Sequence, residues 1–298
     1  MAPLPTLRSR TVLFFGGKGG VGKTTLAAVF ALKSADEGVR TLLVSTDPAH
    51  STGDVLHTPL GPEPTDVVPN LTAVEIDPTL EADRYVAGVK RRIADVTPPR
   101  LVAEVERQID IARVTPGAEE AALFERFTRL MDGLGSDYDR LVFDTAPLGQ
   151  TLRLLSLPEQ MSAWMSGLIG RRRQVNVVGR MWRTVAGAAA GDALSERDPV
   201  LATLEERRDR FIRARTILTD RRRAAFVFVT IAERLAVLET EKGVAALEKF
   251  AIPVGAVIVN RLVADVAAVS PERRRGEARQ LERIRERLGG YPIYLAPA

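Results

Sequence analysis

The chain of 298 residues contains no cysteine, and this absence excludes several classes of protein. Without thiols there are no disulfides, no thiolate zinc or iron–sulfur sites and no cysteine nucleophile. The chain has only two histidines, His50 and His57, so we do not expect a metal site built from imidazoles. Redox proteins and metalloenzymes that depend on these ligands are therefore not candidates.

Aromatic residues and long apolar runs are also scarce. Aromatics make up 5% of the chain, which leaves little surface for stacking on nucleic-acid bases. The net charge is +4, and short arginine runs at 171–173, 221–223 and 273–275 are typical of solvated helix faces. No apolar run is long enough to span a membrane, and prolines interrupt the N-terminal sequence where a signal peptide needs its apolar run. We therefore expect a cytoplasmic protein without a membrane span that does not bind nucleic acid.

What the chain does contain is an alternation of apolar strands and amphipathic helices. A first strand is expected at 11–15, followed by a glycine-rich loop and a helix that ends near Gly38. Further buried strands are expected at 41–46, 140–144, 224–230 and 255–260, with an edge strand near 291–296. This pattern predicts an α/β fold with a doubly wound, mostly parallel sheet that is covered by helices on both faces.

Two long helical stretches interrupt the alternation. Residues 79–134 have a helical pattern with breaks at 97–99 and 116–117, and residues 158–222 form a second such region. We interpret both as helical insertions after core strands, which form a second subdomain within a single domain that spans residues 1–298.

A phosphate-binding loop stands between the first strand and the first helix. The string GKGGVGKT, residues 17–24, matches the pattern G-x-x-x-x-G-K-[ST] in the strand–loop–helix context that the pattern requires. The glycines let successive backbone N–H groups face one phosphate, and the helix N-terminus adds its positive dipole. Lys23 is expected to reach the β- and γ-phosphates of ATP, and the Thr24 hydroxyl to ligate Mg²⁺. The expected nucleotide-binding residues of this loop are Gly17, Lys18, Gly19, Gly20, Val21, Gly22, Lys23, Thr24 and Thr25.

Two aspartates follow the ends of later strands. Asp47, in the string STDPAHS, could be a helix cap or a turn residue, or it could face the γ-phosphate and orient or polarise the attacking water. Asp144 ends the strand at 140–144 and has the position of a Walker B carboxylate, which holds Mg²⁺ directly or through water. Ligands of open α/β sheets bind at the carboxyl ends of the strands, so both carboxylates are candidates for the site of the phosphate-binding loop.

A second lysine in the loop, Lys18, distinguishes this sequence from ordinary phosphate-binding loops. By itself Lys18 could be a solvated side chain. The string KGGVGKT, however, resembles the deviant P-loop ATPases, in which the early lysine reaches the nucleotide of a partner subunit. The resemblance implies a homodimer in which Lys18 acts in trans, in a role comparable to that of an arginine finger.

Four strings taken together resemble the arsenical-pump ATPase (ArsA) family, which includes the ATPase that targets tail-anchored membrane proteins. They are KGGVGKTT, STDPAHS, DTAPLGQTLRLLSLP and IVNR, and they are spread over nearly the whole chain. The resemblance implies that Asp47 activates water in switch I and that Asp144 heads switch II. It also implies that Asn260 contacts the adenine, with Glu233 as an acidic residue on the base side. A strand-end turn for Asn260 and a solvated helix start for Glu233 are the alternatives.

Methionine and tryptophan gather between residues 161 and 182 at helical spacing. Such a stripe can face a protein core, but methionine-rich faces also suit varied apolar partners. The stretch follows switch II, where the targeting ATPase has its client-binding helices, so the resemblance implies a client surface. The candidate residues are Met161, Trp164, Met165, Leu168, Ile169, Val178, Met181 and Trp182.

These patterns favour a Mg²⁺-dependent ATPase that acts as a nucleotide-switched homodimer and binds hydrophobic client segments or tail-anchored-like membrane proteins. One alternative is an energising ATPase of an arsenical-pump-type anion transporter, with a membrane partner. Another is a positioning ATPase of the ParA/MinD kind, although the sequence GGYPIYLAPA is no basic amphipathic helix for membrane binding. The absence of cysteine excludes the thiolate metalloid site of arsenite-binding members and the zinc clamp of the targeting ATPase, so other contacts must hold any dimer.

Overall fold

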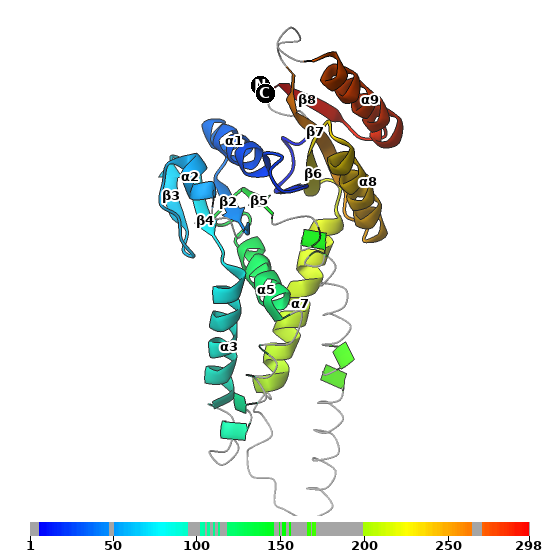
Figure 1. Ribbon diagram of the computed structural model, residues 1–298. Helices are drawn as coiled ribbons and strands as arrows, with labels where there is room; N and C mark the ends of the chain where they lie inside the picture. Colours follow the sequence, from blue (N-terminus) through cyan, green and yellow to red (C-terminus); the bar gives the residue numbers. More distant parts are fainter. Residues whose placement is uncertain are drawn as a thin grey trace, which may run out of the picture. The chain divides into compact units, whose positions relative to one another are not determined.

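The strands that the computed structural model describes form one sheet (Figure 1). The structure describes residues 6–47, 51–94, 118–145, 199–263 and 270–297, with isolated positions between 102 and 113 and between 149 and 170. Within these residues the strand order is β3–β4–β2–β5–β1–β6–β7–β8, and neighbours are parallel except for the antiparallel pair β3–β4. The strands are β1 Val12–Gly16, β2 Thr41–Ser45, β3 Thr65–Val68, β4 Leu71–Glu75, β5 Arg140–Asp144, β6 Ala224–Ile231, β7 Val254–Leu262 and β8 Ile293–Pro297.

The helices of the described residues connect these strands. They are α1 Lys23–Asp36, α2 Thr52–Leu56, α3 Pro78–Ala94, α5 Ala118–Asp132, α7 Pro199–Thr219, α8 Arg234–Lys249 and α9 Pro271–Leu288. The chain divides into two compact units: the first joins Met1–Leu155 to Ile217–Ala298, and the second is Ser156–Thr216. The sheet and the sequence motifs of the phosphate-binding loop lie in the first unit.

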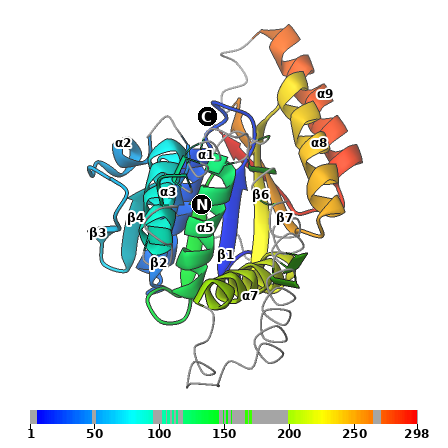
Figure 2. The ribbon, with the colours of Figure 1, turned by 90° about the horizontal axis from the view of Figure 1, so that it is seen from below.

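The two faces of the sheet have different cores. On one face, Leu13 and Phe15 of β1 belong to a buried cluster with alanines of α1. On the other face, Phe14 of β1 stacks on Phe143 of β5 with ring centroids 4.7 Å apart, and Phe127 of α5 lies 4.5 Å from Phe143. The sheet is thus covered by α1 on one face (Figure 1) and by α5 on the other (Figure 2). This burial on both faces is the reason that the strands read as continuous apolar runs.

The predicted fold class is confirmed: the chain is an α/β protein with a mostly parallel sheet. The expected strands correspond to β1, β2, β5, β6, β7 and the edge strand β8, and Gly38 follows α1 with a left-handed φ of 82°. The sequence analysis missed the hairpin β3–β4. Its two strands are joined by Pro69 and Asn70, and Asn70 has a left-handed φ of 64°.

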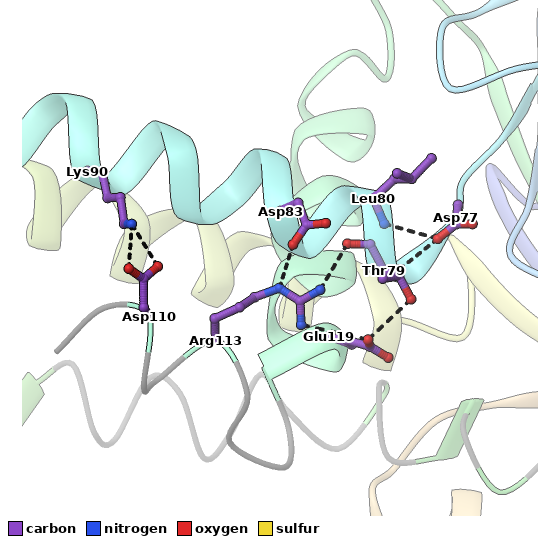
Figure 3. A network of polar contacts seen from close by, with 8 residues as sticks. All are labelled: Asp77, Thr79, Leu80, Asp83, Lys90, Asp110, Arg113 and Glu119. Atoms are coloured by element: carbon purple, nitrogen blue, oxygen red, sulfur yellow. Dashed lines mark hydrogen bonds and ion pairs between the residues drawn. The ribbon is translucent and has the colours of Figure 1, made fainter. Parts of the chain in front are cut away.

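Polar contacts link the residues of the helical region that follows β4 to one another (Figure 3). Asp77 accepts hydrogen bonds from the backbone N–H groups of Thr79 and Leu80, at 2.8 and 3.0 Å, and so caps the start of α3. Arg113 donates to Asp83 of α3 at 2.7 Å and lies 3.9 Å from Glu119 of α5. Helix α5 falls within the region predicted to be helical, residues 79–134, and α3 begins one residue before it. The division of the chain into one domain with two insertions stays a prediction.

The remaining expectations concern arginine runs and membrane segments. The run at 221–223 forms an exposed turn before β6, and the run at 273–275 is exposed on α9. In the part of the chain that the structure describes, no helix combines the length and the apolar character that a membrane crossing requires.

Candidate nucleotide site

The phosphate-binding loop joins β1 to α1, as its motif predicts. Gly17 follows the strand, and a Cβ atom there would lie 2.1 Å from the carbonyl oxygen of Val229 on β6. Gly22 precedes α1 with φ of 96°, and a Cβ atom there would lie 2.4 Å from Nδ2 of Asn260. Only glycine fits both positions, because each combines a left-handed backbone with a close neighbour. Through these close contacts of Gly17 and Gly22, the loop lies against the ends of β6 and β7.

The two lysines of the loop differ in their surroundings. Lys23 is 4% exposed, and its Nζ donates to the carbonyl oxygen of Lys18 at 3.4 Å. The ammonium group of Lys23 therefore lies over the loop, where it can bind phosphate oxygens. The side chain of Lys18 is half-buried, and we find no hydrogen bond or ion pair of its ammonium group within the described ranges.

Asp144 lies at the carboxyl end of β5 and is completely buried. Its Oδ2 accepts a hydrogen bond from the hydroxyl of Thr52 at 3.4 Å, whereas Oδ1 has no hydrogen-bond partner among the described residues. Burial raises the pKa of Asp144 to about 6, and the nearby carboxylate of Asp47 adds to this rise. A hydrogen bond with Thr24 and the charge of Lys23 act in the opposite direction on this pKa. A buried carboxylate with a raised pKa is a candidate functional group, and its role as a metal ligand stays a prediction.

These oxygen ligands fit Mg²⁺. Magnesium is usually held by one or two protein groups together with the phosphates of a substrate. The Thr24 hydroxyl interacts with Asp144 and lies 3.4 Å from the hydroxyl of Ser51. A cation would also satisfy Oδ1 of Asp144, a buried acceptor that otherwise lacks a partner. The described residues include no group of three or more His, Asp or Glu that could form an all-protein metal cage.

Asp47 stands two residues beyond the end of β2 and is half-buried. The preceding residue, Thr46, donates its backbone N–H to the carbonyl oxygen of Asp144 at 3.0 Å. Asp47 also lies close enough to Asp144 for its charge to raise the pKa of that residue. The two carboxylates predicted to share one site therefore do lie together.

Asn260 lies in β7 and Glu233 follows the neighbouring strand β6, and the structure gives them different surroundings. Asn260 pairs with Ile231 across β6 and β7, and its amide Nδ2 donates to the carbonyl oxygen of Val21 at 2.9 Å. Glu233 is the exposed residue before α8 and lines a cavity of about 590 Å³ together with Arg261 and residues of α9. Asn260 thus contacts the phosphate-binding loop directly, and the adenine contacts expected of both residues stay predictions.

Comparison with known proteins gives the family of this chain. The family model described as "Anion-transporting ATPase" matches residues 10–297. The chain belongs to this ArsA ATPase family. It is 34% identical over 252 residues to a putative arsenical pump-driving ATPase 2 of Aquifex aeolicus, which covers 85% of this chain and 80% of that protein. It is 32% identical over 254 residues to ATPase ASNA1 homolog 1 of Paramecium tetraurelia, covering 84% and 74%. It is 31% identical over 253 residues to ATPase GET3 of Malassezia globosa, covering 84% and 72%.

The family resemblance drawn from the motifs is therefore confirmed, and the protein is an ATPase of the ArsA family. Most of switch II and seven of the eight candidate client residues lie outside the described residues. The eighth, Ile169, is buried at 3% exposure. The client surface of this ATPase stays a prediction.

Sequence reasoning missed three residues in and around the candidate nucleotide site. Ser51 and Thr52 place their hydroxyls at Thr24 and Asp144, and Glu75 binds the backbone of Thr52. Ser51 belongs to the string STDPAHS, so its motif could have indicated it. Glu75 ends a strand that was not expected, and the signal for that strand is the Pro-Asn pair between two short runs rich in β-branched residues.

Proposed function

We propose that this ATPase hydrolyses ATP with Mg²⁺ in a homodimer, each subunit lending Lys18 to the nucleotide of its partner. The observation that carries the proposal is the contrast between the two loop lysines. Lys23 is buried over the loop of its own chain, whereas the ammonium group of the half-buried Lys18 makes no hydrogen bond or ion pair within the described residues. A cation supplied in trans is worth about 10³–10⁵ in rate when it is an arginine finger.

The residues of the candidate site have the following roles in this reaction. Lys23 exchanges the carbonyl oxygen of Lys18 for the phosphate oxygens of ATP. Thr24 and Asp144 hold Mg²⁺, which neutralises charge on the phosphates when it is bound. The carboxylate of Asp47 orients the attacking water and accepts its proton. Thr46 holds the end of β2 to Asp144, so Asp47 keeps its place beside the metal carboxylate.

A complementation experiment tests the exchange of lysines. The Lys18→Ala variant and the Asp47→Asn variant are each expected to be inactive alone. In a mixed dimer, the site with intact Asp47 receives Lys18 from the other subunit and regains turnover. Random mixing yields one active site in half of the dimers, so the mixture should reach about a quarter of wild-type activity. A mixture that remains as inactive as its components would show that Lys18 acts within its own chain, and a monomeric active enzyme would exclude the dimer.

We further propose that the ATPase cycle controls the capture of hydrophobic protein segments, such as those of tail-anchored membrane proteins. The similarity to ATPase GET3 supports this role, together with the methionine and tryptophan stripe after switch II. The Asp47→Asn variant, which should bind ATP without turnover, provides the assay. It should retain a synthetic apolar helix in ATP and release it in ADP, and a polar helix of equal length is the control.

The second candidate is an energising subunit of a membrane anion transporter. It is supported by the family description and by relatives whose name is arsenical pump-driving ATPase. In this chain a metalloid could not be held by thiolates, because the chain has no cysteine. ATPase stimulation by a membrane fraction that contains the transporter, with no effect of an apolar helix, would favour this candidate over client capture.

A further inference from the structure

Glu75 is a buried carboxylate in a row of side chains that ends at the nucleotide site. It is the last residue of β4 and is 8% exposed. In the sheet, Ser45 of β2 pairs with Glu75 on one side and with Asp144 on the other. Residues in one register of parallel strands direct their side chains to the same face, so Glu75 and Asp144 share a face, about 10 Å apart across two strand spacings.

Glu75 binds the backbone that leaves switch I. Its Oε1 accepts hydrogen bonds from the N–H groups of Thr52 and Gly53, both at 3.0 Å. These two groups begin the short helix α2, where backbone donors have no partner within the helix. A charged acceptor makes both bonds stronger than bonds between neutral groups.

Thr52 connects this contact to the metal carboxylate. It is completely buried, with its N–H on Glu75 and its hydroxyl on Oδ2 of Asp144 at 3.4 Å. Its neighbour Ser51 has its hydroxyl 3.4 Å from that of Thr24. One turn of chain, 51–53, therefore touches both residues that fit Mg²⁺, and Glu75 holds that turn from behind.

We propose that Glu75 is a positioning residue of the ATPase, which holds the turn at 51–53 so that Ser51 and Thr52 orient Thr24 and Asp144 for Mg²⁺. The inference rests on the Mg²⁺ site of the proposed function. A residue needed only for packing would not have to be charged, and a buried carboxylate costs free energy unless it is hydrogen-bonded. The two backbone donors offset that cost, and the strands hold the acceptor in place.

Amide hydrogen exchange of the metal-free, nucleotide-free protein tests the contact itself. The Glu75→Ala variant should lose protection at the amides of Thr52 and Gly53 by about tenfold or more, the effect of a lost charge-assisted hydrogen bond. The Glu75→Gln variant keeps an acceptor oxygen at the same place and should retain most of this protection. The matched control is Asp77→Ala, which removes a capping carboxylate two residues away that binds α3 instead.

Binding of a fluorescent ADP analogue, titrated with Mg²⁺ alone, tests the consequence. The loss of a supporting residue behind a metal ligand typically weakens metal affinity 10–100-fold, so the Mg²⁺ half-saturation of Glu75→Ala should rise about tenfold. Glu75→Gln should stay within about threefold of wild type, and Asp77→Ala should match wild type. The Thr52→Val variant keeps its N–H but lacks the hydroxyl, so it should raise the half-saturation while both amides stay protected.

Each outcome of these experiments either supports or refutes the positioning role of Glu75. If Glu75→Ala keeps both amides protected, or loses protection with an unchanged Mg²⁺ half-saturation, the positioning role is refuted. A shift of equal size in Asp77→Ala would reduce Glu75 to a general stabiliser and also refute it. If Glu75→Ala does not fold, an unchanged half-saturation in Thr52→Val refutes the proposal by itself. A wild-type protein whose nucleotide binding ignores Mg²⁺ would instead overturn the metal site, even where the exchange data support the contact.

Discussion

The buried carboxylate of Asp144 makes a quantitative prediction about stability in the absence of metal. The Asp144→Asn variant keeps the shape of the side chain but cannot ionise. In the metal-free protein, burial raises the pKa of Asp144 from its ordinary value of 3.8 to about 6. The folded state therefore holds this proton more tightly than the unfolded state. The stabilising contribution is complete below about pH 4 and is lost as the pH rises through 6.

The size of this effect follows from the shift in pKa. A rise from 3.8 to about 6 corresponds to roughly 3 kcal/mol of unfolding free energy, at 1.36 kcal/mol for each pH unit. Wild type should lose this amount, relative to Asp144→Asn, between about pH 4 and pH 7. Above pH 7 the variant should be the more stable protein, although it lacks a ligand of the proposed metal site.

Urea denaturation in EDTA, at intervals between pH 4 and pH 8, measures this difference. The difference between wild type and variant is the informative quantity, because other carboxylates titrate in both proteins. ADP with Mg²⁺ should then stabilise wild type and leave Asp144→Asn nearly unchanged at pH 8. A difference between the two proteins that does not vary with pH would refute the assignment of a buried, desolvated carboxylate.

Three further substitutions test other parts of the site and its support. Asp47→Asn should bind ATP as tightly as wild type, by fluorescence titration, while turnover falls at least about 100-fold, because an amide cannot accept the proton of the water. Gly17→Ala should fold but bind nucleotide at least about tenfold more weakly, since its Cβ would lie 2.1 Å from a carbonyl oxygen of β6; unchanged affinity would contradict the close approach. Arg140→Met should lower the unfolding free energy by about 3 kcal/mol in urea, because the buried guanidinium donates to Ser34 and to two carbonyls of the N-terminal segment.

How much of this fold the sequence predicts depends on how local each signal is. Strands such as β1 and β5 are runs of five buried residues, and a short window reveals them. The hairpin β3–β4 was missed because β3 has only four residues, which alternate between half-buried and exposed at the edge of the sheet. Its pattern is weak in any window that the sequence offers.

The residues of the candidate site also differ in whether a local signal in the sequence indicates them. Lys23 and Thr24 belong to one motif, whose letters and spacing determine their geometry. The importance of Glu75 depends on pairing: its carboxylate reaches Thr52 because β4 lies beside β2, a neighbour about thirty residues away in the chain. Such register is set by the whole sheet, so no motif search could have found this residue.

The segment 75–77, which connects β4 to α3, also separates the candidate nucleotide site from the helices that follow it. Glu75 holds the start of α2, and Asp77 caps α3. Between them, Ile76 is 2% exposed and donates its N–H to the carbonyl oxygen of Ser45 at 2.9 Å. The middle of the segment 75–77 is therefore held by the sheet. Motion of switch I should therefore not reach α3 through this backbone. Glu75→Ala should leave amide protection in α3 unchanged. Reduced protection in α3 would show that the segment 75–77 transmits the motion of switch I.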